Sequence, residues 1–288
     1  LMIRRPPRST LDRASAASDV YKRQKETVTE LGGGPNGAAI GPNGKCYICN
    51  NGGFEWHRSS KGLLFPGMQP VDYSGGRIER VDLTTGQVEV LYTECDGVPL
   101  KGPNDIVFDR QGGFWFTDHG KTRPRDRDRT GVYYASSNGD LIREAIFPLE
   151  APNGIGLSPD AATLYDAETP TGRLWSYPLS EPGKINSTKK PMLLAQIPNY
   201  HLFDSLALDA LGNVGVATLV TGGITTHSAD GKTTSFVEMP DVFTTNICFG
   251  GADLKTAYIT LSTTGRLISC EWDNPGPVSY THLRAHET

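Results

Sequence analysis

The sequence predicts an all-β protein built as a β-propeller, and two observations lead to that prediction. The 288 residues include 33 glycines and 20 prolines, which disfavour long helices and favour many short strands joined by turns. A pattern of strand, turn and strand also recurs five times, at steps of 68, 49, 51 and about 41 residues. Four-stranded units that repeat every roughly 40–50 residues are typical of propeller blades.

Each repeat begins with a polar residue directly before an apolar run. These residues are Asn36, Asn104, Asn153, Asp204 and, in the last copy, Thr245 or Asn246. A turn follows each run and leads into a second strand, predicted at residues 46–49, 114–116, 164–167, 214–217 and 258–260. Third strands are predicted after a glycine, at 76–78, 131–133, 172–174, 223–225 and 265–267, and fourth strands at 87–92 and 140–147.

The first repeat is longer than the others because it holds an insertion at residues 54–74. The insertion contains four large side chains, Trp56, His57, Phe65 and Tyr73. In a propeller, an insertion between strands projects as a loop at one end of the central channel. We therefore expect it to cover the channel mouth.

The two ends of the chain differ from the interior. Residues 1–24 carry six Lys or Arg and two Asp, and neither they nor residues 278–288 show the periodicity of a helix or a strand. Both ends resemble translated sequencing-adapter read-through of the kind found on metagenomic fragments. We expect the propeller to occupy residues 25–277. No credible signal peptide is visible, and a cytoplasmic, bacterial protein is expected.

Charge and composition exclude several classes of partner. Without the two ends, the interior carries a net charge of −8, so it offers no basic stripe for a nucleic acid. No apolar run approaches the length of a membrane span. The five cysteines form no disulfide framework, which suits a reducing compartment. Cys46 and Cys49 point to opposite faces of one strand, so we expect buried cysteines there and no zinc site.

The repeated polar residues are expected to meet at one end of the channel, because each precedes the blade strand closest to the axis. Amide and carboxylate oxygens without clustered thiolates or imidazoles suit a hard cation such as Ca²⁺. The alternative is that the Asn side chains cap strand ends by bonding to backbone. The repeat alone leaves both alternatives open.

A second level of polar residues lies 14–15 positions after the first, at the ends of the second strands. It comprises Asn50, Asp118, Glu168 and Thr218. Asp118, Glu168 and the neighbouring His119 could form a second shell around the site or a second cation site. Ordinary surface acids at strand ends are the alternative for Asp118 and Glu168, and a structural role is the alternative to a His119–Asp118 proton relay.

Five segments also carry a family likeness, namely GGGPNGAAIGPNG, GPNDIVFDRQGGFWFTD, APNGIGLSPD, FDSLALDALGN and TTNICFGG. Together they resemble the gluconolactonase/regucalcin/luciferin-regenerating-enzyme family, with paraoxonase and strictosidine synthase as more distant relatives. The likeness covers about residues 25–276. It implies a six-bladed, calcium-dependent propeller lactonase, with native-looking sequence here for about five blades.

The resemblance also implies roles for particular residues. Asn153 and Asp204 match metal ligands, Ser205 aligns with a further ligand in some relatives, and Asp204 matches the proposed catalytic acid/base. Asn104 matches a substrate-contacting residue, and Asn36 is assigned to substrate binding with it. The implied cofactor is a divalent cation, with Ca²⁺ preferred over Zn²⁺ or Mg²⁺, and the implied substrate is a small sugar-type lactone.

One feature of the family is absent from its expected place. Family members carry a Glu-Gly-Pro motif one blade before the segment that resembles Gly34-Pro35-Asn36, and here residues 1–24 occupy that place. We therefore expect a chain that is truncated at its start, lacks the metal-binding Glu and is impaired as an enzyme. Residues 25–31 are expected to form a strand, either the last of a lost blade or one that closes the ring.

The expected reaction is lactone hydrolysis at the cation, with Asp204 handling the proton. No Gly-x-Ser-x-Gly motif supports a serine nucleophile. Two alternatives remain: a non-catalytic propeller that binds a partner, and a phosphotriesterase-like or strictosidine-synthase-like enzyme on the same fold.

Overall fold

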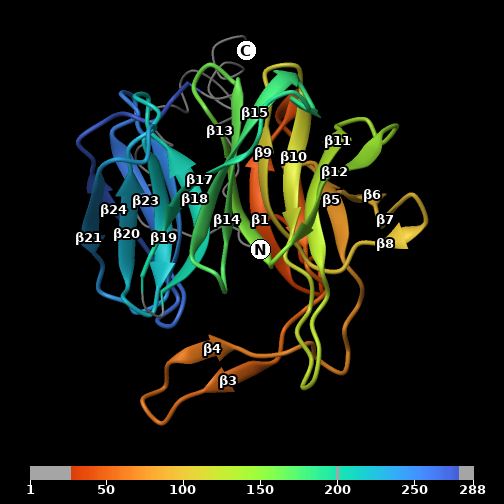
Figure 1. Cartoon of the computed structure of the whole chain (residues 1–288). Coiled ribbons are helices and arrows are strands. Elements are labelled where there is room, and N and C mark those ends of the chain that lie inside the picture. The colour runs from red at the N-terminus through yellow and green to blue at the C-terminus, as the bar shows by residue number, and fades with distance from the viewer. Residues whose placement is uncertain (1–26, 199–200, 279–288) are drawn as a thin grey trace.

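The computed structural model describes residues 27–198 and 201–278, which form five antiparallel sheets around a central axis (Figure 1). The first two blades contain β1 (Pro35–Ile40), β2 (Cys46–Asn50), β5 (Arg77–Val81) and β6 (Val88–Tyr92), then β9 (Pro103–Phe108), β10 (Gly113–Asp118), β11 (Thr130–Ser136) and β12 (Ile142–Leu149). The third contains β13 (Pro152–Leu157), β14 (Thr163–Glu168), β15 (Arg173–Glu181), β16 (Lys184–Ile185) and β17 (Met192–Gln196). The last two contain β18 (Leu202–Leu208), β19 (Val214–Leu219), β20 (Gly223–His227) and β21 (Thr234–Glu238), then β22 (Thr244–Gly250), β23 (Thr256–Leu261) and β24 (Arg266–Glu271).

The blades pack face to face, which explains why their second strands are apolar on both sides. In β10, Phe114 and Phe116 face the first blade, while Trp115 faces the third blade. All three side chains are fully buried. A strand that is covered on both faces is expected to read as a nearly continuous apolar run.

The predicted propeller and its five repeats are confirmed, and each predicted second and third strand overlaps an observed one. Cys46 and Cys49 are buried and unbridged, and they belong to different core clusters. The prediction of a strand at residues 25–31 is wrong for its described part, because residues 27–31 form no strand. Val28 and Leu31 instead pack against the buried apolar cluster of the first blade that contains Cys46 and Ile48.

The predicted ends, residues 1–24 and most of 278–288, lie outside the described residues. In the described part of the chain, no helix has the length and apolar character needed to cross a membrane.

The strands nearest the axis are β1, β9, β13, β18 and β22, and each packs against the next. β1, β9, β13 and β18 run in the same direction and begin at the end of the molecule from which the β3–β4 hairpin projects (Figure 1). β22 begins directly after Phe243, which packs against Phe65 of that hairpin. This hairpin, β3 (Trp56–Arg58) and β4 (Leu64–Pro66), belongs to the insertion predicted to cover the mouth, and a smaller hairpin pairs β7 (Glu94–Cys95) with β8 (Val98–Pro99). The later halves of the inner strands enclose a cavity of about 410 Å³.

Candidate active site

The motif residues are the second or third residues of the inner strands. They lie at the end of the channel that we call the mouth. Asn36 is exposed there, and its amide nitrogen donates to Oδ1 of the buried Asn104 across 3.2 Å. These two amides therefore link the first and second blades. In the fifth blade, Thr245 bonds to Thr260, and the Asn246 oxygen accepts the backbone N–H of Ile247.

Asn153 is held firmly by two threonines and leaves one oxygen unused. Its amide nitrogen donates to Oγ1 of Thr169 at 3.0 Å, and its backbone carbonyl accepts from Oγ1 of Thr117 at 2.6 Å. Its Oδ1 is buried and has no hydrogen-bond partner among the described residues. A buried polar atom without a partner is costly, so this oxygen marks a place where a ligand would be stabilising.

Two carboxyl groups interact beside this amide: Asp204 bonds to the Asn153 side chain, and Asp105 acts on Asp204. The surrounding protein removes water from Asp204 and raises its pKa to about 7, with the negative charge of Asp105 adding to the shift. The Asn153 side chain and the backbone N–H of Ser205 bond to the charged form of Asp204, and these hydrogen bonds oppose the rise in its pKa. Burial likewise raises the pKa of Asp105 to about 7, and the Ser205 hydroxyl bonds to it. Both groups are thus poised to exchange a proton near neutral pH.

The donor set at the mouth fits a hard cation. It offers the unused Asn153 oxygen, the Asp204 carboxylate and the Ser205 hydroxyl, all oxygen atoms. No group of three or more His, Cys, Asp and Glu side chains gathers in the described ranges. A cation at this place would therefore depend on the amide oxygen.

The second polar level supports the backbone. The Asp118 carboxylate accepts the N–H groups of Lys101 and Gly102, both at 2.7 Å, and that of Gly120 at 2.9 Å. Glu168 accepts the N–H of Glu150 at 2.9 Å. Each acid thus fixes the loop that leads into an inner strand and its motif residue. This geometry favours a positioning role for Asp118 and Glu168 over direct binding of a cation.

The equivalent residue of the first blade, Asn50, accepts the N–H of Gly34 at 2.9 Å, two residues before Asn36. The same kind of contact therefore recurs in three successive blades. In the fourth blade, Thr218 instead bonds to Thr225 within its own sheet.

In the part of the chain that the structure describes, no hydrogen bond joins His119 to the Asp118 carboxylate, which accepts only backbone N–H groups. Its imidazole contacts the backbone carbonyl of Pro152, next to Asn153, and its Nδ1 is buried without a partner among the described residues. Burial lowers the pKa of His119 to about 3, and the positive charges of Arg127 and Lys121 lower it further. The ring is therefore neutral, and a His119–Asp118 relay has no contact in this arrangement.

The insertion covers the mouth from the first blade to the fifth. Phe65 of its hairpin packs edge-on against Phe243 with the ring centroids 5.1 Å apart, and the Leu64 N–H donates to the Thr263 carbonyl at 3.2 Å. At its other flank, the N–H of Gln69 bonds to the Thr122 carbonyl at 2.9 Å. We call residues 54–73 the roof, because they cross the end of the channel where the inner strands begin.

Three residues of this site were missed by sequence reasoning. Thr117 and Thr169 orient Asn153, and Asp105 acts on the pKa of Asp204. A signal was available: Thr117 and Thr169 flank Asp118 and Glu168 of the second polar level, and Asp105 directly follows a motif Asn. The contacts of Thr117 and Asp105 join different blades, however, and spacing along the chain does not give such contacts.

Comparisons with known proteins agree with the fold and the motifs. Residues 5–263 match the family described as SMP-30/Gluconolactonase/LRE-like region. A gluconolactonase from Zymomonas mobilis is 28% identical over 247 residues, which cover 80% of this chain and 61% of the relative. The chain thus spans about three fifths of the length of that curated relative.

Solved structures show the same fold. A gluconolactonase from Xanthomonas campestris superposes with a TM-score of 0.66 at 22% identity, covering 88% of this chain and 75% of that one. A calcium-binding regucalcin from Agrobacterium tumefaciens gives 0.58 at 19% identity, with 79% and 81% covered.

Proposed function

Because the chain belongs to the SMP-30/gluconolactonase/LRE-like family, we propose that it hydrolyses a sugar-type lactone at a divalent cation bound in the channel mouth. The observation that carries this proposal is the buried Asn153 oxygen without a partner, beside an Asp204 carboxyl whose pKa is raised to about 7. A scaffold propeller has no need for either feature.

Asn153, Asp204 and Ser205 would hold the cation. Oxygen ligands favour Ca²⁺, with Mg²⁺ and Zn²⁺ as alternatives. When bound, a divalent cation supplies a Lewis acid that polarises a lactone carbonyl and stabilises the oxyanion. Thr169 accepts a hydrogen bond from the amide nitrogen of Asn153 and so fixes the orientation of the amide. The amide oxygen is thereby preorganised to bind the cation.

Asp204 would manage the proton. In its charged form, a carboxylate oxygen accepts a proton from the attacking water, and in its neutral form it returns that proton to the ring oxygen that leaves. Without a cation, burial raises the pKa of Asp204 to about 7, and the positive charge of a bound cation would favour the charged form that accepts the proton. Asp105 contributes by keeping that pKa high.

The amides of Asn104 and Asn36 would position the substrate. They are joined by a hydrogen bond, and Asn36 presents its side chain to solvent at the mouth. Amide groups donate and accept hydrogen bonds, which suits the hydroxyl groups of a sugar lactone. The roof above them would limit access of bulk water to the bound lactone.

The test is a substrate panel assayed with added Ca²⁺ by the acid released at constant pH. The panel contains glucono-δ-lactone, an aliphatic lactone and a phosphotriester. We expect the sugar lactone to be hydrolysed fastest. Turnover of the phosphotriester alone would replace the proposal with a phosphotriesterase, and turnover of nothing in the panel would favour a binding propeller.

A further inference from the structure

Lys121 carries a buried ammonium group beneath the roof. The residue follows β10 and is only 1% exposed. Its Nζ donates to Oδ1 of Asn51 at 3.1 Å and to the Gly53 carbonyl at 2.6 Å. It also lies over the Phe54 ring, 3.8 Å from the centroid, and 5.6 Å from the Tyr73 centroid.

These partners share one property: they lie at the two ends of the insertion or directly beside them. Asn51, Gly53 and Phe54 lie where the chain leaves the first blade, and Tyr73 lies where it returns. The ammonium therefore contacts both ends of the roof from a loop of the second blade. Charge-assisted hydrogen bonds and cation–π contacts are strong when they are desolvated, so a single side chain ties the two ends together.

The lysine is costly at this place, which argues for a role beyond filling space. Burial lowers its pKa to about 8, although the negative charges of Asp118 and Asp128 favour the charged form. An unbranched apolar side chain would pack against the two rings without this desolvation cost. Such a side chain could not donate to the two oxygens that face this position, whereas the ammonium donates to both.

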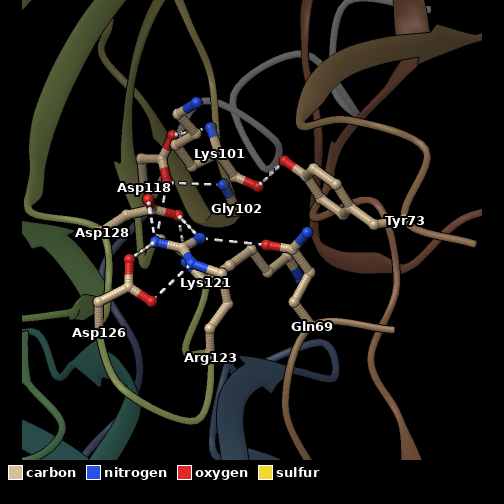
Figure 2. Close-up of polar contacts among 10 residues, drawn as sticks. Gln69, Tyr73, Lys101, Gly102, Asp118, Lys121, Arg123, Asp126 and Asp128 are labelled. Carbon is tan, nitrogen blue, oxygen red and sulfur yellow. Dashed lines mark hydrogen bonds and ion pairs between the residues drawn. The ribbon is translucent and has the colours of Figure 1, made fainter. Parts of the chain in front are cut away.

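A second attachment lies beside the first (Figure 2). Arg123 donates to the side-chain oxygen of Gln69 at 3.1 Å, while Asp126 and Asp128 fix its guanidinium. The Tyr73 hydroxyl donates to the Lys101 carbonyl at 2.5 Å. Besides Lys101, which precedes β9, the loop after β10 thus holds the roof at several points, and Lys121 contacts both of its ends.

We propose that Lys121 is a positioning residue that holds the roof closed over the mouth and thereby sets the affinity for substrate. The statement about affinity rests on the proposed lactone hydrolysis. The statement about the roof rests on the contacts of the ammonium alone.

The first test measures hydrogen–deuterium exchange of peptides from residues 54–73. Lys121→Met keeps the length and the ring contacts but removes the charge, and we expect exchange in the roof to become at least about tenfold faster. Lys121→Arg retains a cation and should recover much of the protection. Lys61→Met is the matched control, because Lys61 lies exposed at the turn of the same hairpin and should exchange as wild type.

Phe54→Leu provides a second variant that leaves the lysine in place. It removes the ring under the ammonium, and we expect a smaller acceleration confined to the same peptides. Unchanged exchange in the roof of both variants would overturn the proposal. So would an equal acceleration in all five blades, since that result means general destabilisation.

The second test separates binding from chemistry. Lys121→Met should raise KM for the lactone by about tenfold while kcat stays within about twofold, because the residue does not touch the reacting atoms. An unchanged KM with a loosened roof would overturn the role in affinity. If the wild-type protein hydrolyses no lactone, the proposed function fails, and the exchange experiment alone decides whether Lys121 holds the roof.

Discussion

Asp118 and Asp166 are both completely buried aspartates on the second strands of neighbouring blades, yet their surroundings differ. Asp118 accepts three backbone N–H groups. Neither oxygen of Asp166 has a hydrogen-bond partner within residues 27–198 and 201–278, and its strand neighbours are Ile155 and Trp175. The pKa of Asp166 is raised well above its usual value by burial, with the charge of Glu168 adding to the effect.

The difference shows that burial of a carboxyl group does not by itself indicate a function. Asp118 fixes the loop that leads to Asn104: burial raises its pKa, and the three backbone N–H groups that shape the mouth oppose that rise without cancelling it. Asp166 occupies a position that is apolar in the other four blades, where Ile48, Phe116, Val216 and Ile259 pair with the corresponding inner strands. We infer that Asp166 destabilises the interface between the second and third blades.

A third carboxyl, that of Asp204, extends the comparison to catalysis and gives the largest expected effect. Asp204→Asn removes the proton-transfer group while keeping the shape, so we expect kcat/KM for the lactone to fall by about 10³-fold. The free energy of unfolding should stay within about 1 kcal/mol of wild type. Initial rates and urea denaturation measure the two quantities. A variant with more than a tenth of the wild-type rate would show that Asp204 is not the acid/base.

Asp118→Asn should act mainly on stability. The new amide N–H would face the Lys101 N–H, so this buried donor loses its acceptor. The N–H groups of Gly102 and Gly120 would then bond to a neutral amide oxygen in place of a charged carboxylate oxygen. We expect a loss of about 3 kcal/mol in the free energy of unfolding, measured by urea denaturation. A loss below about 1 kcal/mol would mean that the three N–H contacts do not hold the loop.

Asp166→Val should have the opposite sign. It replaces an unpaired carboxyl by the type of residue that the other blades use, and we expect a gain of about 1–3 kcal/mol at neutral pH. Asp166→Asn is the matched control, since it keeps an unpaired polar group and should gain less. Destabilisation by Asp166→Val would reveal a polar partner for the carboxyl.

The last comparison is the pH dependence of that gain. The folded-state pKa of Asp166 is raised, so the unfolded chain releases the proton first as pH increases. Wild-type stability contributed by this group is therefore lost above about pH 4, the usual aspartate pKa. The difference in the free energy of unfolding between Asp166→Val and wild type should therefore grow between pH 5 and pH 8. A single titrating group limits the slope to ~1.4 kcal/mol per pH unit. A constant advantage would show that Asp166 ionises normally in the folded protein.

The sequence was most informative where one pattern recurs. Five copies of a motif Asn, Asp or Thr before an apolar run predicted the inner strands and placed Asn104, Asn153 and Asp204 at their starts. The insertion was predicted as a cover, but its contact with Phe243 depends on how the first and fifth blades approach each other. Asp166 could not be distinguished from a surface acid by sequence. In a strand that is buried on both sides, polar and apolar residues do not alternate, so the sequence does not tell which side chains face solvent.

The central claim is that Asn153 and Asp204 bind a cation on which lactone hydrolysis depends. The most direct measurement is the initial rate of lactone hydrolysis after chelation, followed by titration with Ca²⁺, for wild type and Asn153→Leu. We predict that wild type loses its rate on chelation and regains it saturably, while Asn153→Leu requires at least about tenfold more Ca²⁺. A chelated wild-type protein that keeps its full rate would contradict the claim.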